Sequence, residues 1–138
     1  MKKFELLDIA GDAGIRAFGE SEREVFVHAA LGMYSLITDT NVLQDQTSIT
    51  VSAESNTLDG LLVAWLNELV FQFDTYGFIG KNIQVVDFSD NRVTANLSGE
   101  EFDPERHAGR LLIKAATYHR LKIEKKNHIW EAEVIFDV

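Results

Sequence analysis

The sequence predicts an α+β fold of two layers, in which two helices pack on one face of a largely antiparallel (mixed) sheet. Alternating apolar residues near both ends of the chain predict strands, and two amphipathic segments nearer the middle predict helices. Packing both apolar helix faces against one sheet is the natural way to form a core. The 138 residues are expected to make a single domain, 1–138.

The first 40 residues predict a strand pair followed by a helix. Residues 4–7 and 15–18 alternate as strands do, and the two glycines and two aspartates of 8–14 indicate a turn between them. Ser21 and Glu24 have the spacing of a capping box, so we expect a helix to begin there and to end near 38–41. Its predicted buried face contains Val25, Phe26, Ala29, Met33 and Leu36.

A strand at 47–53 and a second helix are predicted next. Thr57 can cap this helix, and Gly77 ends it. The negative charge of Asp59 in the first turn interacts favourably with the positive end of the helix dipole. The helix is expected to contribute most to the core, because its apolar face is wide: Leu58, Leu61, Leu62, Trp65, Leu66, Leu69, Val70 and Phe73.

The second half of the chain returns to a period of two. Residues 83–88 and 92–97 predict a hairpin around a turn at 89–91. The remaining expectations are a polar loop at 99–109, extended segments at 111–119 and 120–124, a turn at 125–127 and a final strand at 129–138.

Composition excludes several kinds of chemistry. The chain has no cysteine, so disulfides, zinc–thiolate sites and cysteine nucleophiles are absent. It has no apolar run of the roughly 20 residues that a membrane helix needs and no evident signal peptide, so we expect a cytoplasmic protein with no membrane contact. The net charge of −9 disfavours strong direct nucleic-acid binding. Such a charge suits a cation, a basic protein surface or, more simply, solubility.

The end of the chain is the most informative segment. Trp130, Ala132, Val134 and Phe136 alternate, which predicts that the last residues belong to a sheet. A strand there would hold the Asp137 carboxylate and the terminal carboxylate of Val138 in fixed positions. Two hard oxygen donors side by side indicate a metal ion or a cationic partner.

Four aspartates stand where predicted elements join: Asp8, Asp12, Asp39 and Asp137. Calcium and magnesium are bound by carboxylate and carbonyl oxygens, and such residues can supply them. Their spacing alone does not identify a site, because no EF-hand loop is present and aspartates more often cap turns.

The basic residues and histidines give weaker indications. Lys114 interrupts an apolar run, so its side chain either points to solvent or reaches a carboxylate cluster or a partner. The four histidines show no metal-binding spacing. His119 is interpreted as a cross-strand contact rather than a general base. No nucleophile elbow or P-loop is present, so no catalytic residue is assigned.

Taken together and in order, six segments resemble the archease family, and the resemblance covers nearly the whole chain. They are residues 11–19 (GDAGIRAFG), 29–33 (AALGM) through 38–39 (TD), 61–69 (LLVAWLNEL), 99–107 (GEEFDPERH), 113–123 (IKAATYHRLKI) and 132–138 (AEVIFDV). The second helix, the Thr-Tyr-His stretch and the terminal Phe-Asp are the most specific parts.

The resemblance implies a function for the chain. Archeases are small cytoplasmic accessory proteins that assist the GTP-dependent RNA ligase of tRNA splicing and RNA repair, which joins a 3′-phosphate or cyclic-phosphate end to a 5′-hydroxyl end. The ligase performs the chemistry, while the archease promotes its guanylylation and repeated turnover. The resemblance therefore implies a non-catalytic activator whose partner is a protein.

The resemblance also implies a set of site residues. The family binds a divalent metal, most often represented as Ca²⁺, with Mg²⁺ and Mn²⁺ as alternatives. Carried over to this sequence, the ligands are Asp12, Asp39, Asp137 and Val138, the last through a main-chain oxygen or carboxylate. Lys114 matches the lysine of the family's Lys-Ala-x-Thr-Tyr stretch and is a further functional candidate.

One segment departs from the family pattern. The family turn usually reads His-Thr-Ala-Asp, whereas this chain has Ile9-Ala10-Gly11-Asp12. The aspartate is kept but the two polar side chains before it are lost, which implies looser metal binding or a divergent partner.

Two other functions remain open from the residues. One is a chaperone or modulator of another RNA-modifying enzyme, such as a methyltransferase, which would not depend on Asp12 and Asp137. The other is a metal-dependent hydrolase that uses the carboxylates, for which the sequence offers no clear nucleophile or base.

Overall fold

The two ends of the chain meet in one five-stranded antiparallel sheet. The computed structural model describes residues 2–138. Strands β1 (Phe4–Ile9) and β2 (Asp12–Gly19) form a hairpin, and β8 (Ile129–Asp137) pairs with β2. The other side of β8 pairs with the short β6 (Ala115–Ala116) and with β7 (Lys122–Lys126). The last strand therefore lies inside the sheet.

A second antiparallel sheet of three strands is made by the middle of the chain. Strand β5 (Arg92–Glu101) lies between β3 (Thr47–Glu54) and β4 (Phe78–Phe88). The β4–β5 hairpin is longer than the sequence predicted, and its register shifts twice along β4.

The two helices have the predicted ends. Helix α1 (Glu22–Ile37) begins at Ser21, whose hydroxyl accepts a hydrogen bond from the Glu24 N–H group. Helix α2 (Leu58–Tyr76) begins at Thr57 and ends at Gly77, which has a φ of 72°. A short 3₁₀ helix, η1 (Thr40–Val42), follows α1.

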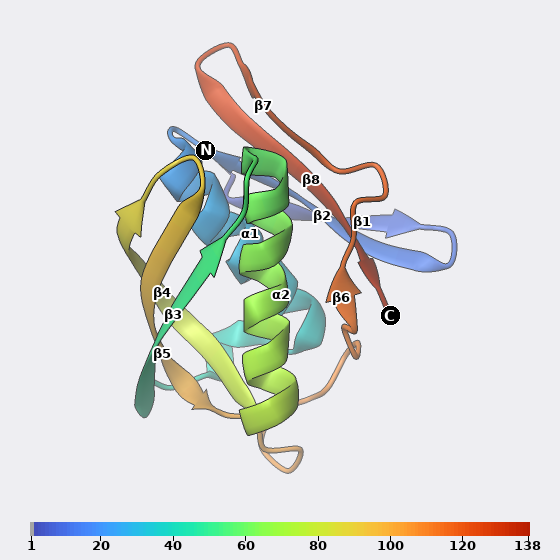
Figure 1. Ribbon diagram of the computed structural model, residues 1–138. Helices are drawn as coiled ribbons and strands as arrows, with labels where there is room; N and C mark the ends of the chain where they lie inside the picture. Colours follow the sequence, from blue (N-terminus) through green and yellow to red (C-terminus); the bar gives the residue numbers. More distant parts are fainter. Residues whose placement is uncertain (1) are drawn as a thin grey trace.

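The helices lie between the two sheets (Figure 1). Helix α1 contacts β2 of the larger sheet and β4 of the smaller one, while α2 contacts β3 and β6. The α+β class with two helices is confirmed, but the strands form two sheets rather than the single mixed sheet that was predicted. The reason lies in α1, which buries residues around most of its circumference and needs a sheet on more than one side.

Three connections differ from the predicted ones. The turn before β8 is Asn127-His128, because Lys125 and Lys126 belong to β7. The turn between β1 and β2 is only Ala10-Gly11, with Gly11 at a φ of 80°, so Asp8 and Asp12 are strand residues. Most of 111–119 is not a strand. Its start instead packs against the end of α1, where the Leu111 N–H group donates to the Leu36 carbonyl over 3.1 Å.

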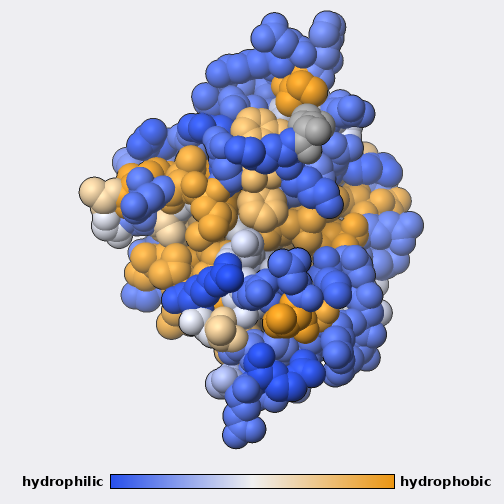
Figure 2. Space-filling view, turned by 180° about the vertical axis from the view of Figure 1, so that it is seen from behind, coloured by the Kyte–Doolittle hydropathy of each residue, from blue (hydrophilic) through white to orange (hydrophobic). Residues whose placement is uncertain are grey.

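The surface opposite α2 carries a broad hydrophobic band across the middle of the molecule, with hydrophilic side chains above and below it (Figure 2). Neither helix in the described part of the chain combines the length and apolar character that crossing a membrane would require.

Candidate functional site

The pairing of β2 with β8 brings Asp12 and Asp137 together. Ala13 is paired with Phe136, so the next positions along the two antiparallel strands are Asp12 and Asp137. Residues opposite one another in such a pair have Cβ atoms about 4.5–5.5 Å apart. Both carboxylates are exposed, and neither forms an ion pair within residues 2–138. Two strands from distant parts of the sequence thus place two carboxylates without ion-pair partners in the described residues at one end of the sheet, which we call the acidic edge or the β2–β8 edge.

These carboxylates line a hollow of about 340 Å³, together with Thr117, His119, Ile135 and Phe136. The Thr117 hydroxyl donates to the Ile135 carbonyl over 2.8 Å and accepts from the His119 N–H group over 3.2 Å. These bonds form a tight turn that carries His119 to the rim of the hollow.

Sequence reasoning missed the roles of Thr117 and His119 here. His119 was interpreted as a cross-strand contact, but it is exposed and lies in the turn before β7. The available signal was the Thr-x-His spacing, because a threonine hydroxyl often bonds the N–H group two residues later.

Lys114 and Val138 adjoin the same edge. The Lys114 N–H group donates to the Asp137 carbonyl over 2.8 Å, and the next residue, Ala115, is paired with Asp137. The Lys114 side chain is exposed, and so is Val138. The structure therefore gathers Asp12, Asp137, Val138 and the main chain of Lys114 at one place.

Asp39 is not part of this hollow. It caps η1, where its Oδ1 atom accepts from the Asn41 N–H group over 3.0 Å. It lines a different hollow, which also contains Lys3, Lys81 and Arg110. In the described chain, residues 2–138, no three His, Asp or Glu side chains are gathered closely enough to hold a metal ion.

The oxygen donors at the β2–β8 edge are of the chemical kind that hard cations bind, although only two of them are carboxylates. Calcium takes six to eight oxygen ligands, which carboxylates, carbonyls and water can supply. Asp12 and Asp137 offer two carboxylates, and Val138, the residue after Asp137, carries a main-chain oxygen. This set is incomplete by itself, so the other positions would be left to water or to oxygen atoms of a partner.

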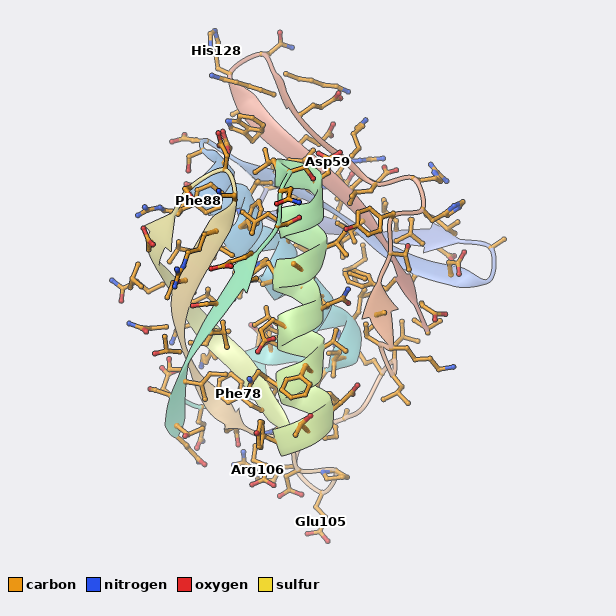
Figure 3. All side chains as sticks on the ribbon, in the orientation of Figure 1. Asp59, Phe78, Phe88, Glu105, Arg106 and His128 are labelled. Carbon is orange, nitrogen blue, oxygen red and sulfur yellow. The ribbon has the colours of Figure 1, made fainter. Side chains whose placement is uncertain are left out.

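A second polar cluster lies away from this edge, and two of its members, Glu100 and His107, are buried. Glu100 is 3 % exposed and faces Arg106 and His107, which follow β5 in the chain. Its Oε2 atom accepts from the Gln44 N–H group over 2.7 Å. In Figure 3, Arg106 and Glu105 mark the end of the molecule opposite His128.

The environment of Glu100 determines its protonation. Burial favours the neutral acid, but the Gln44 N–H group, Arg106 and His107 outweigh burial and lower the pKa of Glu100. Because these contacts fix the loop after β5 to the core, we interpret the cluster as structural.

The fold and the acidic edge define a small α+β protein with two antiparallel sheets around two helices and an exposed pair of carboxylates beside the last strand. Residues 4–138 match the model of the Archease protein family (MTH1598/TM1083), and the chain belongs to the archease family.

Relatives and solved structures agree with this assignment. The chain is 36% identical over 141 residues to the protein archease of Methanosarcina mazei, covering 99% of this chain and 97% of that protein. It is also 36% identical over 141 residues to the protein archease of Methanothermobacter thermautotrophicus, with 100% of both chains covered.

Two solved structures share the fold. The solution structure of Methanobacterium thermoautotrophicum protein 1598 superposes with a TM-score of 0.78 at 34% identity, covering 100% of both chains. A crystal structure of an archease from Thermotoga maritima, described as a possible chaperone, gives a TM-score of 0.70 at 18% identity and covers 96% of this chain and 94% of that one. At that identity, the second likeness concerns the fold alone.

Proposed function

We propose that this archease is a non-catalytic activator of the GTP-dependent RNA ligase of tRNA splicing and RNA repair, and that it promotes guanylylation and multiple turnover of the ligase. Membership of the archease family supports the general role of an accessory protein. The observation that carries the proposal is that the Asp12 and Asp137 carboxylates lie next to each other at the β2–β8 edge. Both are exposed, and neither has an ion-pair partner within residues 2–138.

In this proposal the acidic edge binds a divalent cation, Ca²⁺ in the first instance and Mg²⁺ or Mn²⁺ as alternatives. Asp12, Asp137 and the main-chain oxygen of Val138 are the proposed ligands, and the side chain of Lys114 faces the partner. Because three protein groups do not fill the coordination of calcium, the partner ligase or its nucleotide can supply further oxygens. Asp39, the further ligand that the resemblance implies, lines another hollow and is left out of this proposed set.

The proposal also explains the charge of the protein. An activator that contacts an enzyme rather than RNA needs no basic footprint, and a net charge of −9 suits the approach to a basic enzyme surface. In this role the protein has no turnover of its own and works in the cytoplasm beside its ligase.

The test is RNA ligation by the cognate ligase under single- and multiple-turnover conditions, with and without this protein. Wild-type protein is expected to raise multiple turnover and the extent of ligase guanylylation. Asp12→Asn and Asp137→Asn should each reduce the stimulation at least about tenfold, the loss typical of a removed metal ligand or its support.

Asp87→Asn is the matched control, since it removes the same charge from an exposed position on β4 in the other sheet. Its stimulation is expected to equal that of wild type. If folded Asp12→Asn and Asp137→Asn proteins stimulate fully, the acidic edge has no part in activation. If the wild-type protein leaves the ligase unchanged, the ligase is not the client, and the chaperone role toward another RNA-modifying enzyme becomes the leading candidate.

A further inference from the structure

The hollow that contains Asp39 is basic, in contrast to the protein as a whole. It measures about 480 Å³ and lies between the end of α1, η1 and β4. Its lining includes three cationic side chains, Lys3, Lys81 and Arg110. A volume of this size is within the range of small-molecule sites. Three cations around one hollow are unexpected in a chain with 13 basic and 22 acidic residues.

The three cations are not neutralised by ion pairs. Within residues 2–138 no carboxylate lies within ion-pair distance of any of them. Asp39 is the one acidic residue in the lining of this described hollow, and it leaves a formal excess of two positive charges. Asp45 lies just outside the hollow, where its carboxylate accepts a hydrogen bond from the Asn82 side-chain amide over 2.7 Å.

Two of the cations are held in place while most of their donors stay available. Lys81 Nζ donates to the Leu43 carbonyl over 2.7 Å, and Arg110 Nη1 donates to the Ser35 carbonyl over 3.1 Å. An ammonium group has three N–H donors and a guanidinium group has five. Each side chain is therefore positioned by one bond and retains donors for a ligand, which reduces the entropy lost on binding.

The end of α1 does not cancel this positive field. The last four carbonyl groups of a helix carry partial negative charge when they are unpaired. Here all four accept hydrogen bonds, from the main-chain N–H groups of Thr38, Arg110 and Leu111 and from the Arg110 guanidinium.

We propose that this hollow binds the phosphate group of a small phosphomonoester. Arg110 and the lysines can donate charge-assisted hydrogen bonds. Such bonds are stronger to the anionic oxygens of a phosphate group than to a neutral acceptor. Ser35, Thr40 and Asn41 add polar groups to the rim, while Phe4 and Leu31 supply an apolar wall. The wall is suited to the organic part of the ester.

The site is separate from the acidic edge, so it adds a second ligand to the proposed function and does not depend on it.

The test is a titration of the protein, followed by the chemical shifts of its main-chain amide groups at low ionic strength. The probes are inorganic phosphate, adenosine 5′-monophosphate and, as a comparison anion, acetate. Phosphate is expected to give saturable shifts around Asn41, Lys81 and Arg110, to exceed acetate in affinity, and to weaken as salt is added.

The two phosphate probes distinguish the source of the ligand. Tighter binding of adenosine monophosphate means that the apolar wall takes part and that the ligand is an ester. Equal affinity means that only the phosphate group is recognised. Shifts that do not saturate, or that are the same with acetate, would overturn the proposal.

Variants then connect the shifts to the cations. Arg110→Gln and Lys81→Gln are each expected to weaken phosphate binding about tenfold. Lys3→Gln gives a third variant without risk to folding, because that side chain is exposed and bonds no other group in residues 2–138. It should weaken binding less but measurably. Lys125→Gln removes the same charge from an exposed position on β7 and should bind as wild type does. Unchanged binding in all three hollow variants would exclude the site.

Discussion

Glu100 is a charged residue inside the core, and its surroundings explain how the core accommodates it. A buried carboxylate is costly unless each oxygen is paired. One oxygen accepts from the Gln44 N–H group, and the other faces Arg106 and His107. His107 in turn accepts from the Asp103 N–H group at its Nδ1 atom over 2.8 Å. One acidic residue thus anchors both the segment before β3 and the loop after β5.

This arrangement predicts a stability that depends on pH. The pKa of Glu100 is lower in the folded protein than its ordinary value of 4.5, so its contacts stabilise the fold above pH 4.5 and are lost as the pH falls through the folded pKa. Glu100→Gln should lower the free energy of unfolding at pH 7 by about 1–3 kcal/mol, measured by urea denaturation. The loss should shrink at acidic pH.

The neighbouring residue gives the control. Glu101 has the same charge but is exposed, so Glu101→Gln should change the free energy of unfolding by less than about 0.5 kcal/mol. Equal losses in the two variants would mean that the buried contacts add nothing to stability.

At the level of elements, helix α2 shows how local signals fix both of its ends. Thr57 accepts from the Gly60 N–H group over 3.0 Å at the start. At the other end the Gly77 N–H group bonds back to the Phe73 carbonyl over 2.8 Å, and the Phe102 N–H group bonds to the Gly77 carbonyl over 2.8 Å. The end of the helix is therefore tied to the end of β5.

Gly77→Ala is expected to destabilise the protein by about 1 kcal/mol, because a φ of 72° is unfavourable for a residue with a Cβ atom. The added Cβ would also lie 3.3 Å from Glu101 Cγ. Gly77→Asn should cost less, since asparagine tolerates this conformation. Thermal unfolding of the two variants checks the order, and an alanine variant as stable as wild type would contradict the explanation.

The elements that were predictable are those specified by their own residues. The capping residues and the apolar faces predicted α1 and α2, and the alternation of apolar and polar residues predicted the hairpins. Ala115–Ala116 and the segment before it were not predictable, because their partners lie far away in the chain. The side-chain amide of Asn67 on α2 accepts from the Ala116 N–H group over 2.7 Å, a contact that no local pattern contains.

The same limit applies to the site. Asp12 was predicted to lie in a turn and Asp137 on the last strand, and only the family resemblance connected them; the pairing of β2 with β8 is what brings them together. The position of Asp39 could not be deduced, since it depends on how η1 leaves α1 and on which residues line the space beyond it.

For the whole molecule, the acidic edge is a place where a ligand would bind two distant parts of the chain at once. The described structure pairs β2 and β8 by hydrogen bonds, while the two carboxylates at their ends repel each other. A cation bound between them would replace this repulsion by attraction and would stabilise the folded state alone.

Calcium is therefore expected to raise the midpoint of thermal unfolding. At free Ca²⁺ about 100 times the dissociation constant, the folded state should gain about 2.7 kcal/mol. Asp12→Asn and Asp137→Asn should lose this response, whereas Asp39→Asn should keep it because that residue lines the other hollow. A response lost only in the Asp39 variant would locate the cation in the basic hollow instead.

The position of β8 has a consequence for biosynthesis. The β1–β2 hairpin is made first, yet one side of β2 has no partner until β8 leaves the ribosome more than 100 residues later. During that interval the exposed edge of β2 is open to pairing with other chains, which is a recognised route to aggregation. The nascent hairpin thus depends on rapid closure by β8, and slow translation of the codons between β2 and β8 would lengthen its exposure.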